Sequence, residues 1–336
     1  MPIKLEWSSL QQQWLFSADI WPPGWSKNDI PPLALAIGNF DGLHKGHQKI
    51  MAQLVAHAQK EGLTPAILTF DPHPRQFFAP HISHFTLTPL EIKETLLARY
   101  AVHHLLLLAF DDYVSHLSAQ DFITEILLHK LNVKAIFVGD DFHFGKHRQG
   151  DIHLLRDFAQ KYDFSLVSTS LLQHGDGEII TSTSIRNALE KGDITLANEL
   201  LGRAWGFRAT VLHGAKKGRE IGYPTLNLRL SPDIKLPYGV YTIRVKIIEK
   251  NIEQENSIFY EGVASYGTRP VFDNGIALFE VHLFEFAQDI YDKEIEVDLI
   301  AYQREERNFS SIKALITQIE QDCLIAKQNL QPLRDE

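Results

Sequence analysis

The chain of 336 residues contains a single cysteine, Cys323. One thiol excludes an internal disulfide and any zinc site built from several cysteines, so nothing requires an oxidising compartment. No apolar run approaches the roughly 20 residues that span a bilayer. The N-terminal stretch lacks an apolar segment flanked by basic residues. We therefore expect a cytoplasmic protein with no membrane partner.

Positive charge is also scarce, because 33 Lys and Arg stand against 42 Asp and Glu, for a net charge of −9. A chain without a dense basic block is a poor candidate for sequence-independent nucleic-acid binding. The 16 histidines include no His-Glu-x-x-His pattern, so we expect most of them to be ordinary surface or core residues. The length favours two domains, each able to bury a core.

The segment from Leu33 to His47 combines a strand, a turn and a helix start. The run Leu33 to Ile37 is apolar without alternation, which predicts a strand buried on both faces of a parallel sheet. Helical spacing follows until Gly62, and a second apolar run covers residues 65–70. The ligand site of such a strand-helix-strand unit is expected beyond the carboxyl ends of its strands.

His44 and His47 lie at that end, three positions apart at the start of the helix. They should project from nearly the same face, beside backbone N–H groups that favour an anion. Gly46 has no side chain to keep a phosphate away. We interpret the segment as a nucleotide-binding site; the alternative is a helix start with two solvated histidines.

Strands and helices alternate through the rest of the first half. Residues 1–31 are interpreted as an irregular approach without chemistry. The segment Phe70-Asp-Pro-His-Pro74 is either a wall of a substrate pocket or a rigid connector. The further elements that the pattern predicts are helices at 90–100, 119–131, 184–191 and 194–201 and strands at 105–110, 135–138 and 165–168.

Polar groups again follow the strand at 135–138. Asp141 could accept a hydrogen bond from a base or a ribose hydroxyl, whereas Phe142 and Phe144 either pack beside a planar ligand or belong to the core. The Ser and Thr residues at 181–184 suit a helix start. Arg186, in the first turn of that helix, is a bidentate donor that suits a pyrophosphate leaving group.

From Gly202 onward the periodicity is two, which predicts an antiparallel sheet or a small barrel. A helix capped by Ser310 or Ser311 carries an apolar stripe that should dock on this barrel. The predicted strands lie at residues 240–248, 258–264, 277–286 and 295–302.

The glycine-rich segment 213–227 looks suited to wrapping phosphates. On an extended strand the oxygens of Thr225 and Asn227 point the same way, as needed to hold one hard cation such as Mg²⁺. The alternative is a hairpin with a charged loop. Glu280 lies on the polar face of 279–283 and is either a base or a solvated strand residue.

Taken together, these motifs resemble the bacterial bifunctional riboflavin kinase/FMN adenylyltransferases, or FAD synthetases, over about residues 33–326. The resemblance implies an α/β nucleotidyltransferase domain (Rossmann-like, parallel sheet) at 1–186, a helical linker at 187–202, and a six-stranded flavokinase β-barrel with a C-terminal helix at 203–336. The motifs occur in family order: Gly38-Asn-Phe-Asp-Gly-Leu-His-Lys-Gly-His47, Phe70-Asp-Pro-His-Pro74, Val138-Gly-Asp-Asp-Phe-His-Phe-Gly145, Ser182-Thr-Ser-Ile-Arg186, Gly222-Tyr-Pro-Thr-Leu-Asn227, Gly267-Thr-Arg-Pro270 and Glu280-Val-His-Leu283.

The resemblance implies two reactions: riboflavin plus ATP giving FMN and ADP, then FMN plus ATP giving FAD and pyrophosphate. It assigns Glu280 as catalytic base, Mg²⁺-ATP to Thr225 and Asn227, and ATP phosphates to His44 and His47. Ser182, Thr183 and Arg186 would contact phosphate. The remaining ATP or flavin contacts that it implies are Gly38, Asn39, Phe40, Asp41, Gly46, Asp141, Gly214, Lys216, Gly218, Gly222 and Arg269. The expected state is a monomer or a transient homo-oligomer.

The sequence departs from the family pattern near the second site. Leu226 replaces a usual Ala, Ser265 and Tyr266 replace Asn-Ile, Val271 replaces Thr, and Asp292 replaces Gly. One rival interpretation is therefore an adenylyltransferase with a non-catalytic, flavin-binding barrel. A tRNA-handling relative is disfavoured because the Lys-Met-Ser-Lys-Ser segment and a basic stripe are missing.

Overall fold

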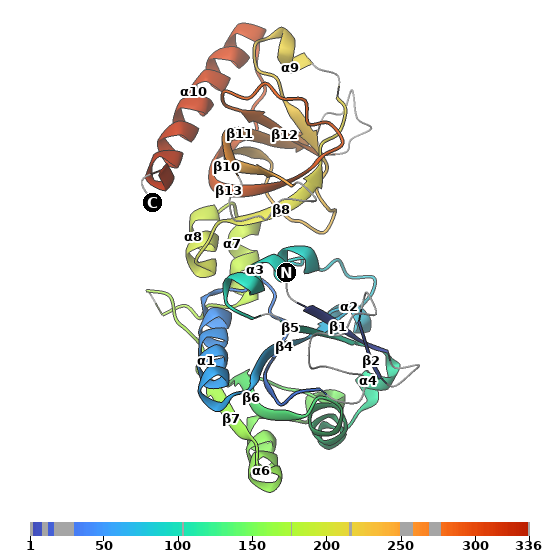
Figure 1. Ribbon diagram of the computed structural model, residues 1–336. Helices are drawn as coiled ribbons and strands as arrows, with labels where there is room; N and C mark the ends of the chain where they lie inside the picture. Colours follow the sequence, from blue (N-terminus) through green and yellow to red (C-terminus); the bar gives the residue numbers. More distant parts are fainter. Residues whose placement is uncertain are drawn as a thin grey trace. The chain divides into compact units, whose positions relative to one another are not determined.

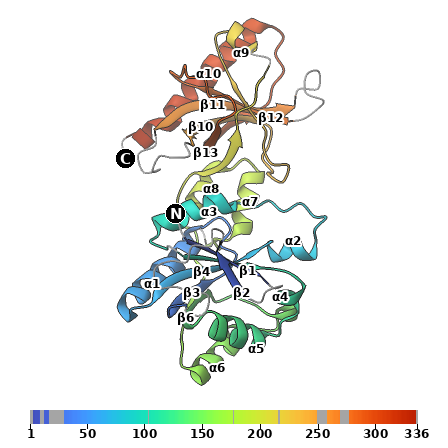
Figure 2. The same cartoon turned by 45° about the vertical axis from the view of Figure 1, so that its right-hand side comes forward.

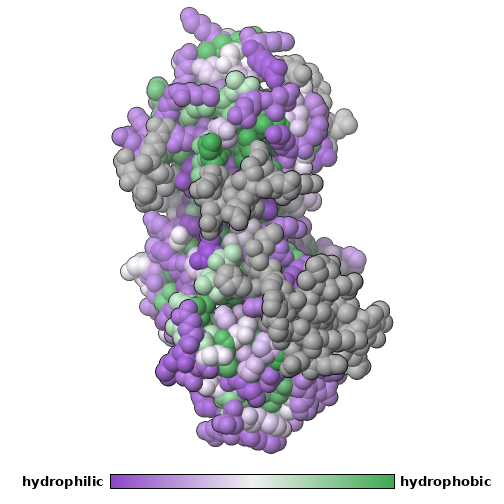
Figure 3. Space-filling view, viewed as in Figure 1, coloured by the Kyte–Doolittle hydropathy of each residue, from purple (hydrophilic) through white to green (hydrophobic). Residues whose placement is uncertain are grey.

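The computed structural model describes residues 3–8, 13–16, 30–102, 104–175, 177–214, 217–248, 258–268 and 277–334. The chain divides into two compact units, Met1–Ser182 and Thr183–Glu336 (Figure 1). Among the described residues, no helix is both long and apolar enough to cross a membrane. Hydrophilic side chains predominate among the coloured residues of the face in Figure 3, with hydrophobic ones scattered between them.

The first unit is built on a seven-stranded sheet in the order β2-β1-β5-β4-β3-β6-β7. Its strands are β1 (Ile3–Ser8), β2 (Gln13–Phe16), β3 (Leu33–Ile37), β4 (Thr64–Asp71), β5 (His104–Ala109), β6 (Val133–Gly139) and β7 (Ser165–Thr169). Only β2 runs antiparallel to its neighbour. The chain moves outward from β3 through β4 to β5 and then returns to the other side of β3. This reversal of direction, between β3 and β6, is where sheets of this kind bind ligands.

The N-terminal segment corrects one sequence interpretation. Residues 1–31 were expected to be irregular, but Ile3–Ser8 and Gln13–Phe16 form β1 and β2. β1 pairs in parallel with β5, with Ile3 opposite His104 and Trp7 opposite Leu108. The short alternation of apolar and polar residues from Ile3 to Trp7 is weak by itself. Pairing with the edge of β5 is what makes it a strand.

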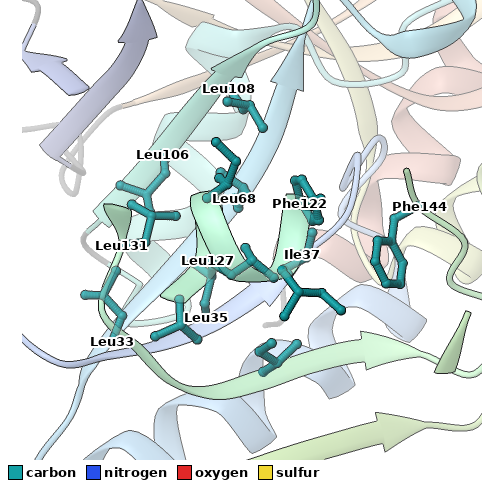
Figure 4. Close-up of a cluster of buried hydrophobic side chains, with 14 of the residues drawn as sticks. Leu33, Leu35, Ile37, Leu68, Leu106, Leu108, Phe122, Leu127, Leu131 and Phe144 are labelled. Atoms are coloured by element: carbon teal, nitrogen blue, oxygen red, sulfur yellow. The ribbon is translucent and has the colours of Figure 1, made fainter. Parts of the chain in front are cut away.

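Helices cover both faces of this sheet. They are α1 (Lys45–Glu61), α2 (Pro74–Phe78), α3 (Leu90–Arg99), α4 (Asp112–His116), α5 (Ala119–Asp121), the π-helix η1 (Phe122–Lys130), the 3-10 turn η2 (Lys146–Arg148) and α6 (Ile152–Tyr162). Leu33, Leu35 and Ile37 point to the cluster under α5 and η1, which Figure 4 shows. Ala34 and Ala36 point to the opposite cluster, under α1 and α3. The two helix layers are visible in Figure 2, and they confirm the prediction of a parallel sheet buried on both faces.

The second unit contains a six-stranded antiparallel sheet in the order β8-β13-β10-β11-β12-β9. Its elements are α8 (Ile194–Leu201), β8 (Trp205–Thr210), α9 (Lys217–Glu220), β9 (Leu226–Leu228), β10 (Gly239–Ile247), β11 (Phe259–Thr268), β12 (Ala277–Leu283), β13 (Glu294–Glu305), α10 (Ile312–Leu330) and the 3-10 turn η4 (Gln331–Arg334). α7 (Ser182–Glu190) begins where the units divide. The N–H of Leu212, just after β8, donates to the carbonyl of Asn227 in β9 at 2.8 Å. The two edge strands therefore meet, as a small barrel requires.

The predicted C-terminal helix docks on this sheet, which confirms the expectation. Of the two candidate serines, Ser311 caps it, because its Oγ accepts the N–H of Ala314 at 3.1 Å. Asp322, 3% exposed, accepts hydrogen bonds from Nε and Nη2 of Arg304 in β13 at 2.9 and 2.6 Å. The helix is thus held by a buried bidentate ion pair as well as by apolar packing.

We expect Asp322→Ala to lower the free energy of unfolding of the second unit by about 3 kcal/mol or more, because it leaves the Arg304 charge buried without its carboxylate. Urea unfolding followed by hydrogen exchange in peptides of β10 and α10 measures this. The matched control is Glu320→Ala, an exposed carboxylate on the same helix. Equal stabilities of the two variants would contradict the prediction.

Candidate active sites

The turn after β3 folds inward before α1 begins. Phe40 is 1% exposed and has a φ of 47°. A Cβ on Gly38 would lie 3.3 Å from its ring. Phe40 is therefore a core side chain that shapes the turn. Gly42 and Leu43 also have positive φ, at 88° and 46°, so three of these residues adopt the left-handed conformation that most side chains avoid.

Asp41 uses its buried carboxylate to hold a neighbouring segment. Its Oδ1 accepts the N–H of Thr88 at 2.9 Å and its Oδ2 accepts that of Leu87 at 3.2 Å. The N–H of Gly42 donates to the Thr88 hydroxyl at 3.0 Å. These bonds join the turn to the segment before α3, so the side chain of Asp41 is committed to the backbone.

His44 is the N-cap of α1. Its Nδ1 accepts the backbone N–H of His47 at 3.4 Å, so the neutral ring carries its proton on Nε2. The two imidazoles stack with centroids 3.7 Å apart. His44 is only 7% exposed and His47 is partly buried. The alternative of two solvated histidines is therefore wrong.

Burial decides the charge state of both imidazoles. It lowers the pKa of His44 to about 4, although Asp41 opposes this shift. It also lowers the pKa of His47 well below the usual value, and the charges of His44 and Lys93 act in the same direction. Both rings are thus neutral at pH 7 and offer N–H groups rather than positive charges.

Asp141 lies just beyond β6, at the reversal of strand order. A Cβ on Gly139 would approach its Oδ1 to 2.8 Å, so glycine leaves room for this carboxylate. Asp141 is exposed, as a ligand contact needs. Phe144, by contrast, is 6% exposed and packs against Phe122 with centroids 5.7 Å apart. Phe144 is therefore a core residue and does not pack beside a ligand.

Ser182 connects the start of α7 to the turn after β3, because its Oγ donates to the carbonyl of Asp41 at 2.8 Å. Thr183 follows and is exposed, and Arg186 lies one helical turn further along. The helix starts at Ser182, two residues earlier than predicted.

A cavity of about 110 Å³ lies at the carboxyl end of β4. Asp71, the last residue of β4, and His73 line it, so the segment 70–74 forms part of the wall of a pocket; that this pocket holds a substrate stays a prediction. Its lining residues are Asn39, Asp41, Thr69, Phe70, Asp71, His73, Gln76, Thr86, Thr88, Leu90, Lys93 and Leu107. Lys93 was missed by the sequence analysis, although a lysine one turn before Leu96 and Leu97 on a helix is a visible signal.

The second unit aligns Asn227, Glu280 and Ser265 on neighbouring strands. Glu280 in β12 is directly opposite Asn227 in β9 and Ser265 in β11. Directly opposite residues share one face of a sheet, with Cβ atoms about 5 Å apart. The predicted base and the predicted metal ligand are therefore neighbours.

Two glycines border the same place. A Cβ on Gly214 would lie 1.8 Å from Nδ2 of Asn227, so a larger residue would displace this amide. A Cβ on Gly218 would lie 2.2 Å from the carbonyl of Tyr223 and 3.4 Å from Oγ1 of Thr225. The backbone thus runs close to both predicted oxygen ligands, which are of the kind that Mg²⁺ prefers.

His282 supports the segment before Thr225. Its Nδ1 donates to the carbonyl of Pro224 at 2.9 Å, and its ring packs edge-on against Tyr223 with centroids 5.3 Å apart. This fixes the backbone one residue before Thr225. It also explains why a histidine shares the polar face with Glu280.

Asp292 shows how one departure from the family pattern is accommodated. Its φ is 60°, a conformation that glycine adopts without strain and aspartate tolerates. Its carboxylate lies 3.3 Å from Nε2 of His213, next to Gly214. Gly222 has a φ of 88°. Lys216, Arg269 and Val271 lie outside the described residues.

Comparisons with known proteins agree with the division of the chain into two units. The family model for FAD synthetase matches residues 26–184, and the family model for riboflavin kinase matches residues 201–330. The enzyme named bifunctional riboflavin kinase/FMN adenylyltransferase from Escherichia coli K12 is 37% identical over 295 residues, which cover 88% of this chain and 91% of the relative. The protein of the same name from Buchnera aphidicola (Schizaphis graminum) is 36% identical over 88% of this chain and 93% of its own.

A solved structure covers nearly the whole chain. The crystal structure described as a macrolide-efflux protein from Streptococcus pneumoniae superposes with a TM-score of 0.79 at 30% sequence identity. The match spans 95% of this chain and 97% of the other.

The buried His44 predicts a pH dependence of stability. Its folded pKa is about 4 and its ordinary value is 6.5. The unfolded chain therefore takes up a proton as pH falls below 6.5, and the folded chain does not. The contribution of His44 to the free energy of unfolding is fully present above pH 6.5 and is lost as the pH falls toward 4. Between pH 7.5 and 5 this group should cost the first unit about 2 kcal/mol.

We expect His44→Asn to remove that part of the pH dependence, because asparagine caps a helix but does not titrate in this range. Urea unfolding at pH 7.5 and 5, read by hydrogen exchange in peptides of β3 and α1, tests it. An unchanged difference between the two pH values would show that His44 titrates normally in the folded state.

Proposed function

The chain belongs to the family of bifunctional riboflavin kinase/FMN adenylyltransferases, and on that premise we propose which residues carry each reaction. The chain phosphorylates riboflavin to FMN and adenylylates FMN to FAD, with ATP as co-substrate of both steps. We assign the adenylyl transfer to residues 1–186, the phosphorylation to residues 203–336, and a linking role to 187–202. The observation that carries the assignment of the kinase site is the direct pairing of Asn227 with Glu280.

The kinase step transfers the γ-phosphoryl group of ATP to an alcohol. A bond forms between the ribityl oxygen and the γ-phosphorus, the bond to the β-phosphate oxygen breaks, and the hydroxyl proton must leave. Glu280 takes this proton as general base. Thr225 and Asn227 would hold Mg²⁺, which would neutralise charge on the β and γ phosphates. Gly214 and Gly218 let the backbone approach these phosphates.

The same pairing supports a catalytic barrel over one that only binds flavin. A barrel that only binds flavin would not need a carboxylate next to the Asn227 amide. Nor would it need glycine at position 214, where a Cβ would lie 1.8 Å from that amide. Ser265, the departure from the family pattern, lies on the other side of Glu280, so it leaves that pair in register. For the same reason we follow the flavin chemistry rather than the macrolide-efflux description of the similar crystal structure.

The adenylyl step makes different demands. The FMN phosphate is largely ionised at pH 7, since its second pKa is about 6, and it can attack the α-phosphorus of ATP without a base. The site must stabilise charge on the departing pyrophosphate. Because both imidazoles are neutral, we assign His44 the role of an Nε2–H donor and Arg186 that of the cation. Asp141 and Asn39 would contact the nucleotide or flavin. The oligomeric state and a cytoplasmic location stay predictions.

Glu280→Gln should stop riboflavin phosphorylation, because an amide cannot accept the hydroxyl proton, while FMN supplied to the variant is still converted to FAD. Chromatographic separation of flavins over time in Mg²⁺ and ATP measures both steps in one reaction. A kinase rate equal to that of the unaltered chain would refute the assignment of the base.

His44→Ala should have the reciprocal effect. Loss of a well-placed donor to the leaving group raises the barrier by roughly 3 to 4 kcal/mol, so FAD formation should fall by at least a hundredfold while FMN accumulates from riboflavin. If FMN fails to accumulate in this variant, the division of labour between the two units is wrong.

A further inference from the structure

α3 carries a lysine on its buried face. Lys93 is 9% exposed, and the residues one turn further along, Leu96 and Leu97, belong to the apolar cluster under the sheet. Lysine is almost never this deeply buried unless its ammonium group has partners. The position therefore needs a physical reason, and neither of the proposed mechanisms uses it.

The partners of Lys93 come from the turn after β3. Its Nζ donates to the carbonyl of Asn39 at 2.8 Å, and the hydroxyl of Thr69 donates to the same carbonyl at 3.1 Å. Burial lowers the pKa of Lys93, while the carboxylates of Asp41 and Asp71 oppose the shift. The carbonyl of Asn39 and these two carboxylates offset part of the cost of burying the ammonium group.

Two polar atoms in the turn after β3 and the start of α1 lack hydrogen-bond partners. Within the part of the chain that the structure describes, Oδ1 of Asn39 and Nδ1 of His47 are buried and unpaired. Such atoms are rare in folded proteins and often mark a functional site. One belongs to the residue whose carbonyl Lys93 holds. The other belongs to the ring whose pKa the charge of Lys93 helps to lower.

We propose that Lys93 is a positioning residue for adenylyl transfer, because its ammonium holds the carbonyl of Asn39 and thereby fixes the turn that presents Asn39 and His47 to the nucleotide. This role rests on the proposed function of the first unit. Thr69 shares the task through the same carbonyl. Lys93 lines the cavity at the end of β4, so its charge also contributes to the field at that pocket.

The test compares Lys93→Met with the unaltered chain. Methionine keeps an unbranched side chain of similar length but removes the charge and the donor. We expect kcat/KM for FMN adenylylation to fall about tenfold or more, as for loss of a buried charged hydrogen bond. Riboflavin phosphorylation by the same preparation should be unchanged. Lys60→Met, which removes an 80% exposed lysine, should leave both activities intact.

A second pair of variants tests the shared carbonyl. Thr69→Val is nearly isosteric and removes only the hydroxyl donor, so it should lower adenylylation by a smaller factor. Because both side chains act on one carbonyl, the effects of Lys93→Met and Thr69→Val should not multiply in the double variant. Independent, multiplying effects would overturn the proposed route through Asn39.

Titration of His47 by NMR tests separately whether the charge of Lys93 acts on this ring. Asp41, His44 and Asp71 are charged or titratable groups that act on this lysine or histidine, and His73 lines the same cavity as Lys93. Removing the Lys93 charge while these remain should raise the pKa of His47 relative to that in the unaltered chain. The signal is assigned by its loss in His47→Gln.

The outcomes separate the two proposals. If the unaltered chain forms no FAD from FMN, the proposed function of the first unit fails. If it forms FAD and Lys93→Met does so equally well, the role of Lys93 fails. Should Lys93→Met not fold, Thr69→Val decides: reduced adenylylation with normal phosphorylation supports the role, and unchanged adenylylation overturns it.

Discussion

The turn after β3 has to leave a fully buried strand and start a helix within seven residues, Gly38 to His44, while its backbone groups remain hydrogen bonded. Side chains from elsewhere in the first unit meet this demand. Lys93 and Thr69 hold the carbonyl of Asn39, and Ser182 donates to that of Asp41. The buried carboxylate of Asp41 holds the segment before α3 in return. The position of the two histidines depends on this set of bonds.

The chemistry of the first site follows from the same burial. Desolvation keeps His44 and His47 neutral, so in the proposed role the rings would donate hydrogen bonds to charge that develops on the leaving group and would bring no charge of their own. A preorganised N–H group in a site shielded from water stabilises developing charge more strongly than the same group does in solution, because no solvent has to reorient as the reaction proceeds. The second site is organised differently. There, strand register places Asn227 and Glu280 side by side, and glycines at 214 and 218 keep side chains off the neighbouring backbone.

Much of this could be predicted from sequence because the relevant signals are local. The unbroken apolar run at 33–37 predicts a buried strand, the spacing of His44 and His47 places both at one helix start, and alternation at 279–283 puts Glu280 on the polar face. The sequence pattern did not predict β1, β2 and β8, because each has only four to six residues and forms where a neighbouring edge pairs with it. The alternative that His44 and His47 are solvated was wrong, because the surrounding segments bury them.

By itself, the sequence determined the family, the order of the two catalytic regions and the identity of most residues proposed for the sites, since these are carried by short motifs and their spacing. Tertiary structure alone decided what those residues can do. Protonation of His44, commitment of the Asp41 carboxylate to two amides, the place of Phe144 in the core and the link from Lys93 to Asn39 all depend on atoms distant in the chain. Burial and hydrogen bonding are properties of the folded surroundings, so a motif names its side chains without setting their charge or their partners.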